Sequence, residues 1–225
     1  MPKKKNAFVL LAAWCLAAGI VLVPMLFGIA MACFPPGYAG ATEGYSFSRH
    51  VVSDLGRTHL DNGRPNTLSC GLFALAMILS GAVSALFWIA RQLFVRHPLA
   101  RRSVLVCGLF TSVCLAAIGL TPLDRAAPIH DPITAATAVG AALAILALSA
   151  DPDTRLQSRS SKRLWLAALM LVTASWTVLV ALHHEHLLAF RPWLPLGQKT
   201  LICTFISWLV YQNALLFKSQ RTQLA

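Results

Sequence analysis

The chain has 225 residues, of which 57% are hydrophobic and only 12% are charged, and its formal net charge at pH 7 is +11. Soluble globular domains carry about 25% charged residues, so the composition excludes an ordinary soluble domain and favours an integral membrane protein. The basic excess lies in short segments between apolar runs. We therefore attribute it to membrane topology and to contact with anionic membrane lipids, and not to nucleic-acid binding.

Six apolar runs are each about 20 residues long, the length that an α-helix needs to cross a hydrocarbon core about 30 Å thick. Irregular backbone exposed to lipid would leave polar groups unsatisfied. The runs therefore predict an all-α polytopic membrane protein, one domain over residues 1–225 that forms a six-transmembrane-helix bundle. The predicted spans are residues 7–33, 67–90, 103–123, 132–150, 164–182 and 198–217.

The first run follows three lysines and ends in Ala30-Met31-Ala32-Cys33, which loosely resembles a cleavage site. Because its apolar stretch exceeds the roughly 7–15 residues of a signal-peptide core, we favour an uncleaved anchor over a signal peptide. The six cysteines lie in or at the ends of the spans and are interpreted as small packing residues. A bridge between Cys33 and Cys70 near the outer surface is the alternative.

The distribution of Lys and Arg predicts the orientation of the spans. By the positive-inside rule, the segments rich in these residues are cytoplasmic, so both termini are predicted inside, in a multi-pass protein of the cytoplasmic (inner) membrane. The basic residues of these segments are Lys3, Lys4, Lys5, Arg91, Arg96, Arg101, Arg102, Arg155, Arg159, Lys162, Arg163, Lys218 and Arg221. The outer side then holds His50, His59, His130, His183, His184, His186, Glu43, Asp54, Asp61, Asp124, Asp131 and Glu185.

The first outer loop, residues 34–66, is the longest connection in the chain. Loops longer than about 12–15 residues are uncommon in compact domains and usually have a function or act as lids. Residues 46–60 are predicted to form a short interfacial helix that one of its first serines caps. The side chains that would share one side of this helix by their spacing are His50, Ser53, Asp54 and Arg57.

Polar residues at the ends of the later spans lie on the same predicted outer side of the membrane. Asp124 closes the third predicted span, and His130 precedes the fourth, which Asp131 and Pro132 are predicted to begin as cap and first helical residue. Three histidines follow the fifth span. The residues expected to contact a substrate or a lipid head group are His50, Arg57, Arg191 and Lys199.

Zinc is the sharpest chemical hypothesis for the histidines. A catalytic zinc site takes three protein ligands and keeps one position open. His183 and His186 can supply two ligands from one helix end, with His130 or His50 as the third. The spacing permits such a site without defining it, since the chain contains neither HExxH nor HxxxH. A hydrogen-bonded polar cluster without metal is the alternative.

Two further arrangements use the same residues. Asp54 or Asp124 can orient a metal ligand or act as a base. Ser53, His130 and Asp124 come from separate elements, as the members of a catalytic triad usually do. A bis-histidine haem is disfavoured, because it needs histidines within the spans, whereas every histidine here lies in a loop or at a predicted helix end.

Several short motifs together resemble a known family, the bacterial membrane family catalogued as domain of unknown function 998, and more distantly the DRAM-type membrane proteins. These motifs are Ser53-Asp54-Leu55-Gly56, Pro65-Asn66, Gly119-Leu120-Thr121-Pro122 with Asp124, His130, and Gly197-Gln198-Lys199. The resemblance covers nearly the whole chain and implies a multi-helix bundle, but no activity. It marks Ser53, Asp54, Thr121, Asp124 and His130 as matching positions. The family pattern has Arg where Lys199 stands.

Two functional classes stay open at this point. In the first, the outer polar pocket belongs to a metal-dependent hydrolase or acyl transferase that acts on a lipid. The residues assigned to its chemistry are Ser53, Asp54, Asp124 and His130, and its zinc ligands are His130, His183 and His186. In the second, the same groups bind a lipid head group or an ion for transport or sensing. A secondary transporter is disfavoured, because no acidic or basic residue is predicted in the middle of a span.

Overall fold

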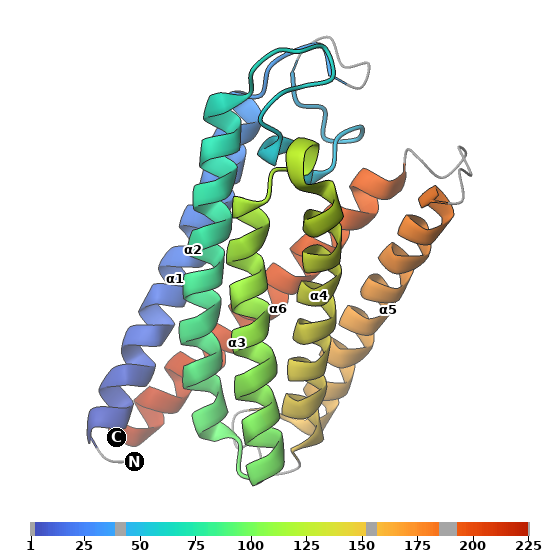
Figure 1. Ribbon diagram of the computed structural model, residues 1–225. Helices are drawn as coiled ribbons and strands as arrows, with labels where there is room; N and C mark the ends of the chain where they lie inside the picture. Colours follow the sequence, from blue (N-terminus) through green and yellow to red (C-terminus); the bar gives the residue numbers. More distant parts are fainter. Residues whose placement is uncertain (1–2, 39–43, 152–156, 185–192, 225) are drawn as a thin grey trace.

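Figure 1 shows the computed structural model of the chain, which describes residues 3–38, 44–151, 157–184 and 193–224. The described residues form helices joined by loops and turns, with no strand among them, and an isolated antiparallel bridge joins His59 and Pro65. The helices are α1 (Lys3–Ala32), η1 (Val52–Gly56), α2 (Thr67–Arg91), η2 (Gln92–Phe94), α3 (Pro98–Leu120), α4 (Leu123–Ala150), α5 (Arg159–His184) and α6 (Trp193–Leu224), where η marks a 3₁₀ helix.

The six α-helices of the described residues are each long and apolar enough to cross a membrane. This confirms the predicted all-α bundle of six spans, and the protein is a multi-pass membrane protein. Large apolar side chains such as Leu11, Val113 and Leu171 are more than half exposed on the helix surfaces. Such exposure is expected where the surrounding solvent is lipid, whose tails are as apolar as leucine.

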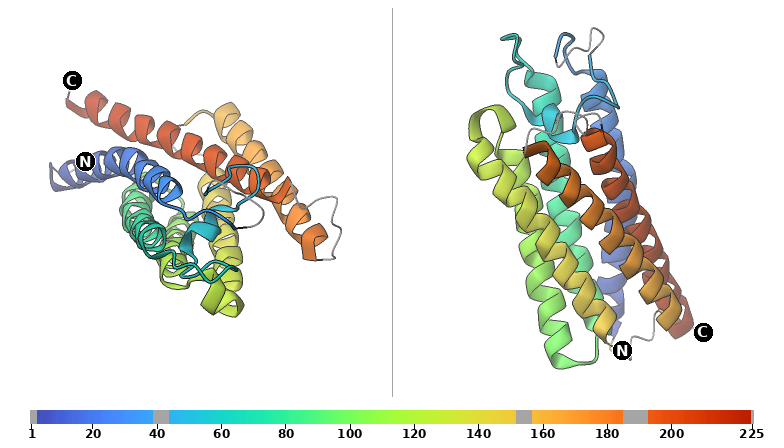
Figure 2. Two further views of the ribbon diagram at one scale, coloured as in Figure 1. Left: turned by 90° about the horizontal axis from the view of Figure 1, so that it is seen from above. Right: turned by 90° about the vertical axis from the view of Figure 1, so that its right-hand side faces the viewer.

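The helices form a ring in chain order. Each packs on the next, and α6 returns to pack on α1. Helix α6 crosses the bundle obliquely, from the end that holds both termini to a position beside α5 at the opposite end (Figure 1). We call these the terminal end and the loop end of the bundle, because the first loop folds over the latter (Figures 1 and 2).

Close packing is tightest between α2 and α3. A Cβ at Gly108 would lie 2.3 Å from Cγ of Trp88, so only glycine allows this approach of the two helices. Trp88 in turn packs against Phe87 and Trp208, with ring centroids 4.8 and 5.9 Å away. These buried rings form the centre of the core toward the terminal end.

Helix α4 begins at Leu123 and not at the predicted residue 132. Asp131 and Pro132 therefore lie inside the helix, and Asp131 does not cap it. Ala126 has non-helical dihedrals (φ −132°, ψ 27°), so the helix restarts there. Pro128 then falls in the first turn of the restarted helix, where a missing backbone N–H removes no helical hydrogen bond. The prediction missed this because Pro132, preceded by Asp131, looked like the first residue of a helix.

Helix α3 also begins earlier than predicted, at Pro98, which occupies the first turn of the helix as proline often does. The predicted interfacial helix over residues 46–60 is shorter in the structure. The regular helix in this region is the five-residue η1, and the rest of the segment folds as turns over the bundle. Cys33 and Cys70 are both free thiols, so the bridge between them does not form.

Candidate functional site

His50 lies at the centre of an aromatic cluster under the first loop. Its ring is fully buried, with the ring centroids of Phe34, Tyr38 and Tyr45 between 5.2 and 5.4 Å away. Nδ1 accepts a hydrogen bond from the backbone N–H of Ser46 at 2.9 Å, so Nε2 carries the proton and donates to Tyr38 O at 3.0 Å. Both ring nitrogens are engaged, and the imidazole stabilises the loop.

Asp54 is buried and accepts three hydrogen bonds. The donors are Val51 N (2.9 Å), the Tyr38 hydroxyl (3.1 Å) and Arg57 Nε (3.0 Å). The guanidinium of Arg57 also lies over the Tyr38 ring, 4.9 Å from its centroid. Asp54 and Arg57 thus share one side of the loop segment, as predicted, and the carboxylate caps η1.

The electrostatics of this group follow from burial and from the Asp54 charge. Burial and the neighbouring carboxylate raise the pKa of Tyr38 well above its ordinary value, and burial also raises that of Tyr45. For Arg57, burial lowers the pKa, but the hydrogen bond and charge of Asp54 outweigh it and raise the pKa overall. Tyr38 therefore stays neutral and Arg57 charged at physiological pH.

Asp124, in the first turn of α4, joins the helix to the loop. Its carboxylate accepts from Thr58 N (2.8 Å), Thr58 Oγ1 (2.6 Å) and His59 N (3.1 Å). Although the residue is exposed, its oxygens are occupied by backbone and hydroxyl donors. The arrangement fastens the loop to α4.

Two consecutive residues of α6 hold the loop from the opposite side. Gln198 Oε1 accepts from Val52 N at 2.6 Å, and Lys199 Nζ donates to His50 O at 2.5 Å. The buried ammonium also lies 4.7 Å from the centroid of the Phe47 ring and 5.4 Å from that of Tyr45, so cation–π attraction supplements its hydrogen bonds. Lys199 thus binds the loop without an acidic partner among the described residues, and the Arg that the family pattern has at this position is not needed for the contact.

His130 differs from the other predicted site residues. It is buried, and its Nδ1–H donates to Thr121 O at 2.6 Å. That bond leaves Nε2 as the unprotonated nitrogen, and in the described residues Nε2 is buried without a hydrogen-bond partner. A histidine held in this way by a backbone carbonyl is typical of a metal ligand or a base.

The remaining predicted ligands are only partly described. His183 lies in the last turn of α5 and its side chain is outside the described residues, as are His186 and Arg191 altogether. In the part of the chain that the structure covers, no three His, Cys, Asp or Glu side chains are grouped to hold a metal ion. The zinc set of His130, His183 and His186 therefore stays a prediction.

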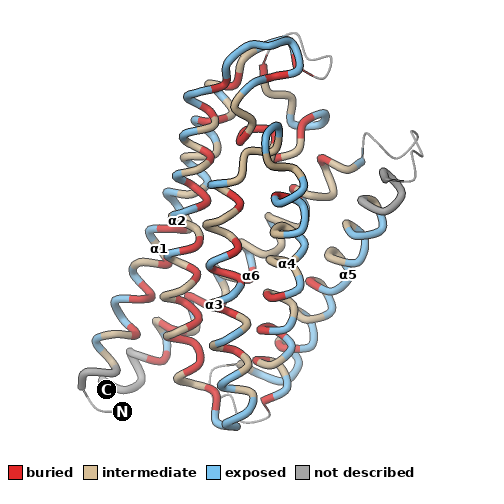
Figure 3. The backbone as a smooth tube through the Cα atoms, in the orientation of Figure 1, coloured by how far each residue is buried: buried red, intermediate tan, exposed pale blue. Residues whose placement is uncertain are grey.

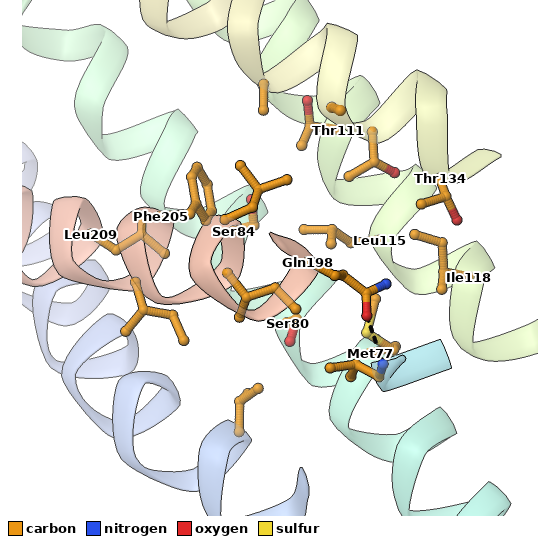
Figure 4. Close-up of a pocket in the computed structure, with 18 of the residues that line it drawn as sticks. Met77, Ser80, Ser84, Thr111, Leu115, Ile118, Thr134, Gln198, Phe205 and Leu209 are labelled. Atoms are coloured by element: carbon orange, nitrogen blue, oxygen red, sulfur yellow. Dashed lines mark hydrogen bonds between the residues drawn. The ribbon is translucent and has the colours of Figure 1, made fainter. Parts of the chain in front are cut away.

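Beneath the loop, the six helices surround a cavity of about 300 Å³ (Figure 4). It extends from Val52 and Ser53 of η1 to Ile145 and Leu166, in the terminal half of α4 and α5. Among the described residues, the lining is mostly apolar and includes no Asp, Glu, Lys, Arg or His. Its polar members are Ser53, Ser80, Ser84, Thr111, Thr134, Thr137, Thr173 and Gln198.

Sequence reasoning did not predict this cavity. Its lining residues look like ordinary apolar span residues, and each helix contributes only a few of them. One signal was present in the chain, the small residues Ala138, Ala141 and Ala142 of α4, which line the cavity and leave space where larger side chains would fill it. Gln198 was noted as a polar residue at the start of the sixth span and in the family resemblance, without a role.

The fold and site define a multi-pass membrane protein of six spans, whose helices surround an apolar cavity closed at one end by a hydrogen-bonded loop. The chain belongs to the family described as "Protein of unknown function (DUF998)", whose model matches residues 26–212. This confirms the resemblance that the short motifs indicated. No curated protein and no solved structure matches the chain.

Proposed function

We propose that the protein binds the hydrocarbon chain of a lipid in the cavity of its bundle, without catalysing a reaction. The observation that carries this proposal is an apolar cavity of about 300 Å³ whose lining, in the part of the chain that the structure describes, has no ionisable side chain. Ligand pockets begin at roughly this volume, and apolar cavities of about half the size already bind apolar molecules.

The energetics favour an occupied cavity. Empty apolar volume destabilises a protein by about 24 cal/mol per Å³, which for this cavity amounts to roughly 7 kcal/mol. That figure is comparable with the whole stability of many folded domains, about 5–15 kcal/mol. A lipid chain surrounds the protein at high concentration and would restore the missing dispersion contacts.

Access to the cavity is easiest past α5. Only 11% of the α5 span is buried, against 39% for each of α2 and α3, and Figure 3 shows the sparse buried positions along α5. Leu169, Met170 and Thr173 of α5 line the cavity opposite Ala138 and Ala141 of α4. A modest displacement of α5 from α4 would therefore admit a chain sideways from the bilayer.

A lipid hydrolase or acyl transferase is the second candidate, and His130 is the observation that favours it. Its free Nε2 is suited to hold zinc or to accept a proton. Asp54 and Asp124 would have to give up structural hydrogen bonds to take part. In addition, His130 is not among the residues that line the cavity, so a bound chain and this base would not meet. Binding without chemistry is favoured on these grounds.

Filling the cavity tests the proposal. Ala138 of α4 lines the cavity, whereas Ala135 on the same helix is exposed. We expect native mass spectrometry of the purified protein to detect retained lipid in the wild type and in Ala135→Trp, and to detect little in Ala138→Trp. The Ala138→Trp protein should unfold no earlier than wild type stripped of lipid. Equal lipid retention in the two tryptophan variants would overturn the proposal.

A further inference from the structure

We infer that the bound chain carries a small uncharged head group with an acceptor oxygen, which Ser53 and Gln198 hold at the loop end of the cavity. The ligand class is a neutral single-chain lipid, such as a long-chain alcohol or its ester. The inference rests on the proposed function and adds what the cavity recognises.

The orientation of the Gln198 amide is determined by the loop. Its oxygen faces the backbone N–H of Val52, which can only donate. The amide nitrogen must then point away from Val52, and among the described residues it has no acceptor. Figure 4 shows this amide at the cavity beside the end of the bundle. Two N–H donors are thus available to a ligand.

Further uncommitted donors lie near this amide. The Ser53 hydroxyl, next to Val52 in η1, lines the cavity and has no hydrogen-bond partner within the described chain. Within the described residues, the indole N–H of Trp176 is buried without a partner, and its ring lies close to Gly197, the residue before Gln198, where a Cβ would be 3.5 Å from Cδ1. A buried donor without an acceptor is destabilising, so an acceptor oxygen bound here would be stabilising.

Four of the other cavity hydroxyls already have acceptors. Ser80, Thr111, Thr134 and Thr137 each donate to a backbone carbonyl of their own helix, at 2.7 to 2.9 Å. Ser84, which accepts from Ser112 at 3.0 Å, and Thr173 each offer a single hydroxyl donor on the helix walls. The Gln198 amide and the Ser53 hydroxyl, which adjoins the bonded Val52, supply several donors at the loop end, so an acceptor head group finds more partners there, and the hydrocarbon chain extends toward Ile145.

The head group is uncharged because no side chain in the described lining of the cavity would neutralise it. Lys199, adjacent to Gln198, is engaged with His50 O and two aromatic rings, and Arg57 is paired with Asp54. Against these residues, a carboxylate or phosphate would have to lose its hydration without gaining a cation, which is unfavourable. A neutral oxygen avoids this cost.

The test compares three ligands of one chain length on the purified, delipidated full-length protein: the alcohol acetate ester, the fatty acid and the alkyl phosphate. We expect the ester to bind at least about tenfold more tightly than the two anions, a difference of about 1.4 kcal/mol or more. Binding is followed by native mass spectrometry and by thermal stabilisation. Tight binding of the acid or the phosphate would overturn the inference.

Substitution of Gln198 separates ligand binding from loop anchoring. Gln198→Glu keeps an oxygen for Val52 N but removes the donors, so ester affinity should fall about tenfold or more while thermal stability without ligand is retained. Ser53→Ala should weaken ester binding, whereas Ser207→Ala, an exposed position on α6, should not. Unchanged ester affinity in Gln198→Glu would overturn the head-group assignment and leave lipid binding intact. Failure of the wild type to bind any of the three chains would instead overturn the proposed function.

Discussion

The loop and the cavity beneath it contrast in how their polar groups are used. In the loop, Asp54 and His50 are buried among donors and acceptors that satisfy them. In the described lining of the cavity, the polar groups are neutral, and those at the loop end have unused hydrogen-bonding capacity. The comparison teaches that residue types associated with catalysis can have their hydrogen-bonding capacity used by the fold, and it directs the search for a ligand to the groups whose capacity is unused.

The membrane orientation gives the largest expected effect, because a reporter is either translocated or not. The distribution of basic residues predicts that the loop faces away from the cytoplasm. Periplasmic reporters fused after His59 or after Leu188 should be active, and those fused after Arg101 or Lys162 inactive. The reverse pattern would place the loop and the loop end of the cavity at the cytoplasmic face.

Asp54 tests whether the loop is held by its buried carboxylate. Asp54→Ala removes three accepted hydrogen bonds, among them the one from the Arg57 guanidinium, which should destabilise the protein by about 3 kcal/mol. Asp61→Ala is the matched control, because this carboxylate also contacts Arg57, at 3.6 Å, but is 75% exposed. Its loss should cost less than about 1 kcal/mol. Thermal unfolding in detergent measures both.

The variant Asp54→Asn tests whether the charge of this carboxylate has a role beyond holding the loop. Asn is also a good helix cap, so Asp54→Asn should recover part of the stability that alanine loses while lipid retention stays at the wild-type level. Loss of lipid or of a cellular activity in a stably folded Asp54→Asn protein would instead support a chemical role for this carboxylate.

His130 combines features of the loop and of the cavity, because one of its ring nitrogens has a hydrogen-bond partner and the other has none among the described residues. His130→Asn can keep a donor for Thr121 O and removes Nε2. Under the lipid-binding proposal, the variant should lose about 1 kcal/mol of stability from the smaller side chain and retain lipid. Elemental analysis decides the zinc hypothesis. Stoichiometric zinc in the wild type that is absent from His130→Asn and from a His183→Ala, His186→Ala double variant would favour the enzyme.

The smallest effect concerns the tyrosines of the loop. The pKa values of Tyr38 and Tyr45 are raised by burial, so the folded protein keeps these protons when the unfolded chain has lost them. Their contribution to stability is complete below the unfolded pKa of about 10 and declines as pH rises above it. The melting temperature should fall above about pH 10, and Tyr45→Phe should make that fall shallower.

The sequence by itself determined the class of fold, the number of spans and the membership in the family. Each of these depends on local composition, because a run of about 20 apolar residues in lipid can satisfy its backbone only as a helix. The pairing of Asp54 with Arg57 was also within reach, since the residues are three apart. Local patterns misplaced the start of α4, where Pro132 looked like a first helical residue but follows a kink at Ala126.

Only the tertiary structure decided which polar groups are occupied. The partners of Asp124 and Gln198 come from the first loop, 65 or more positions away along the chain, and no spacing rule indicates them. The cavity is the clearest case, because Ser53, Ala138 and Trp176 line it from three separate elements. A void is what the side chains of several helices together fail to fill, so it becomes apparent only when all of them are packed.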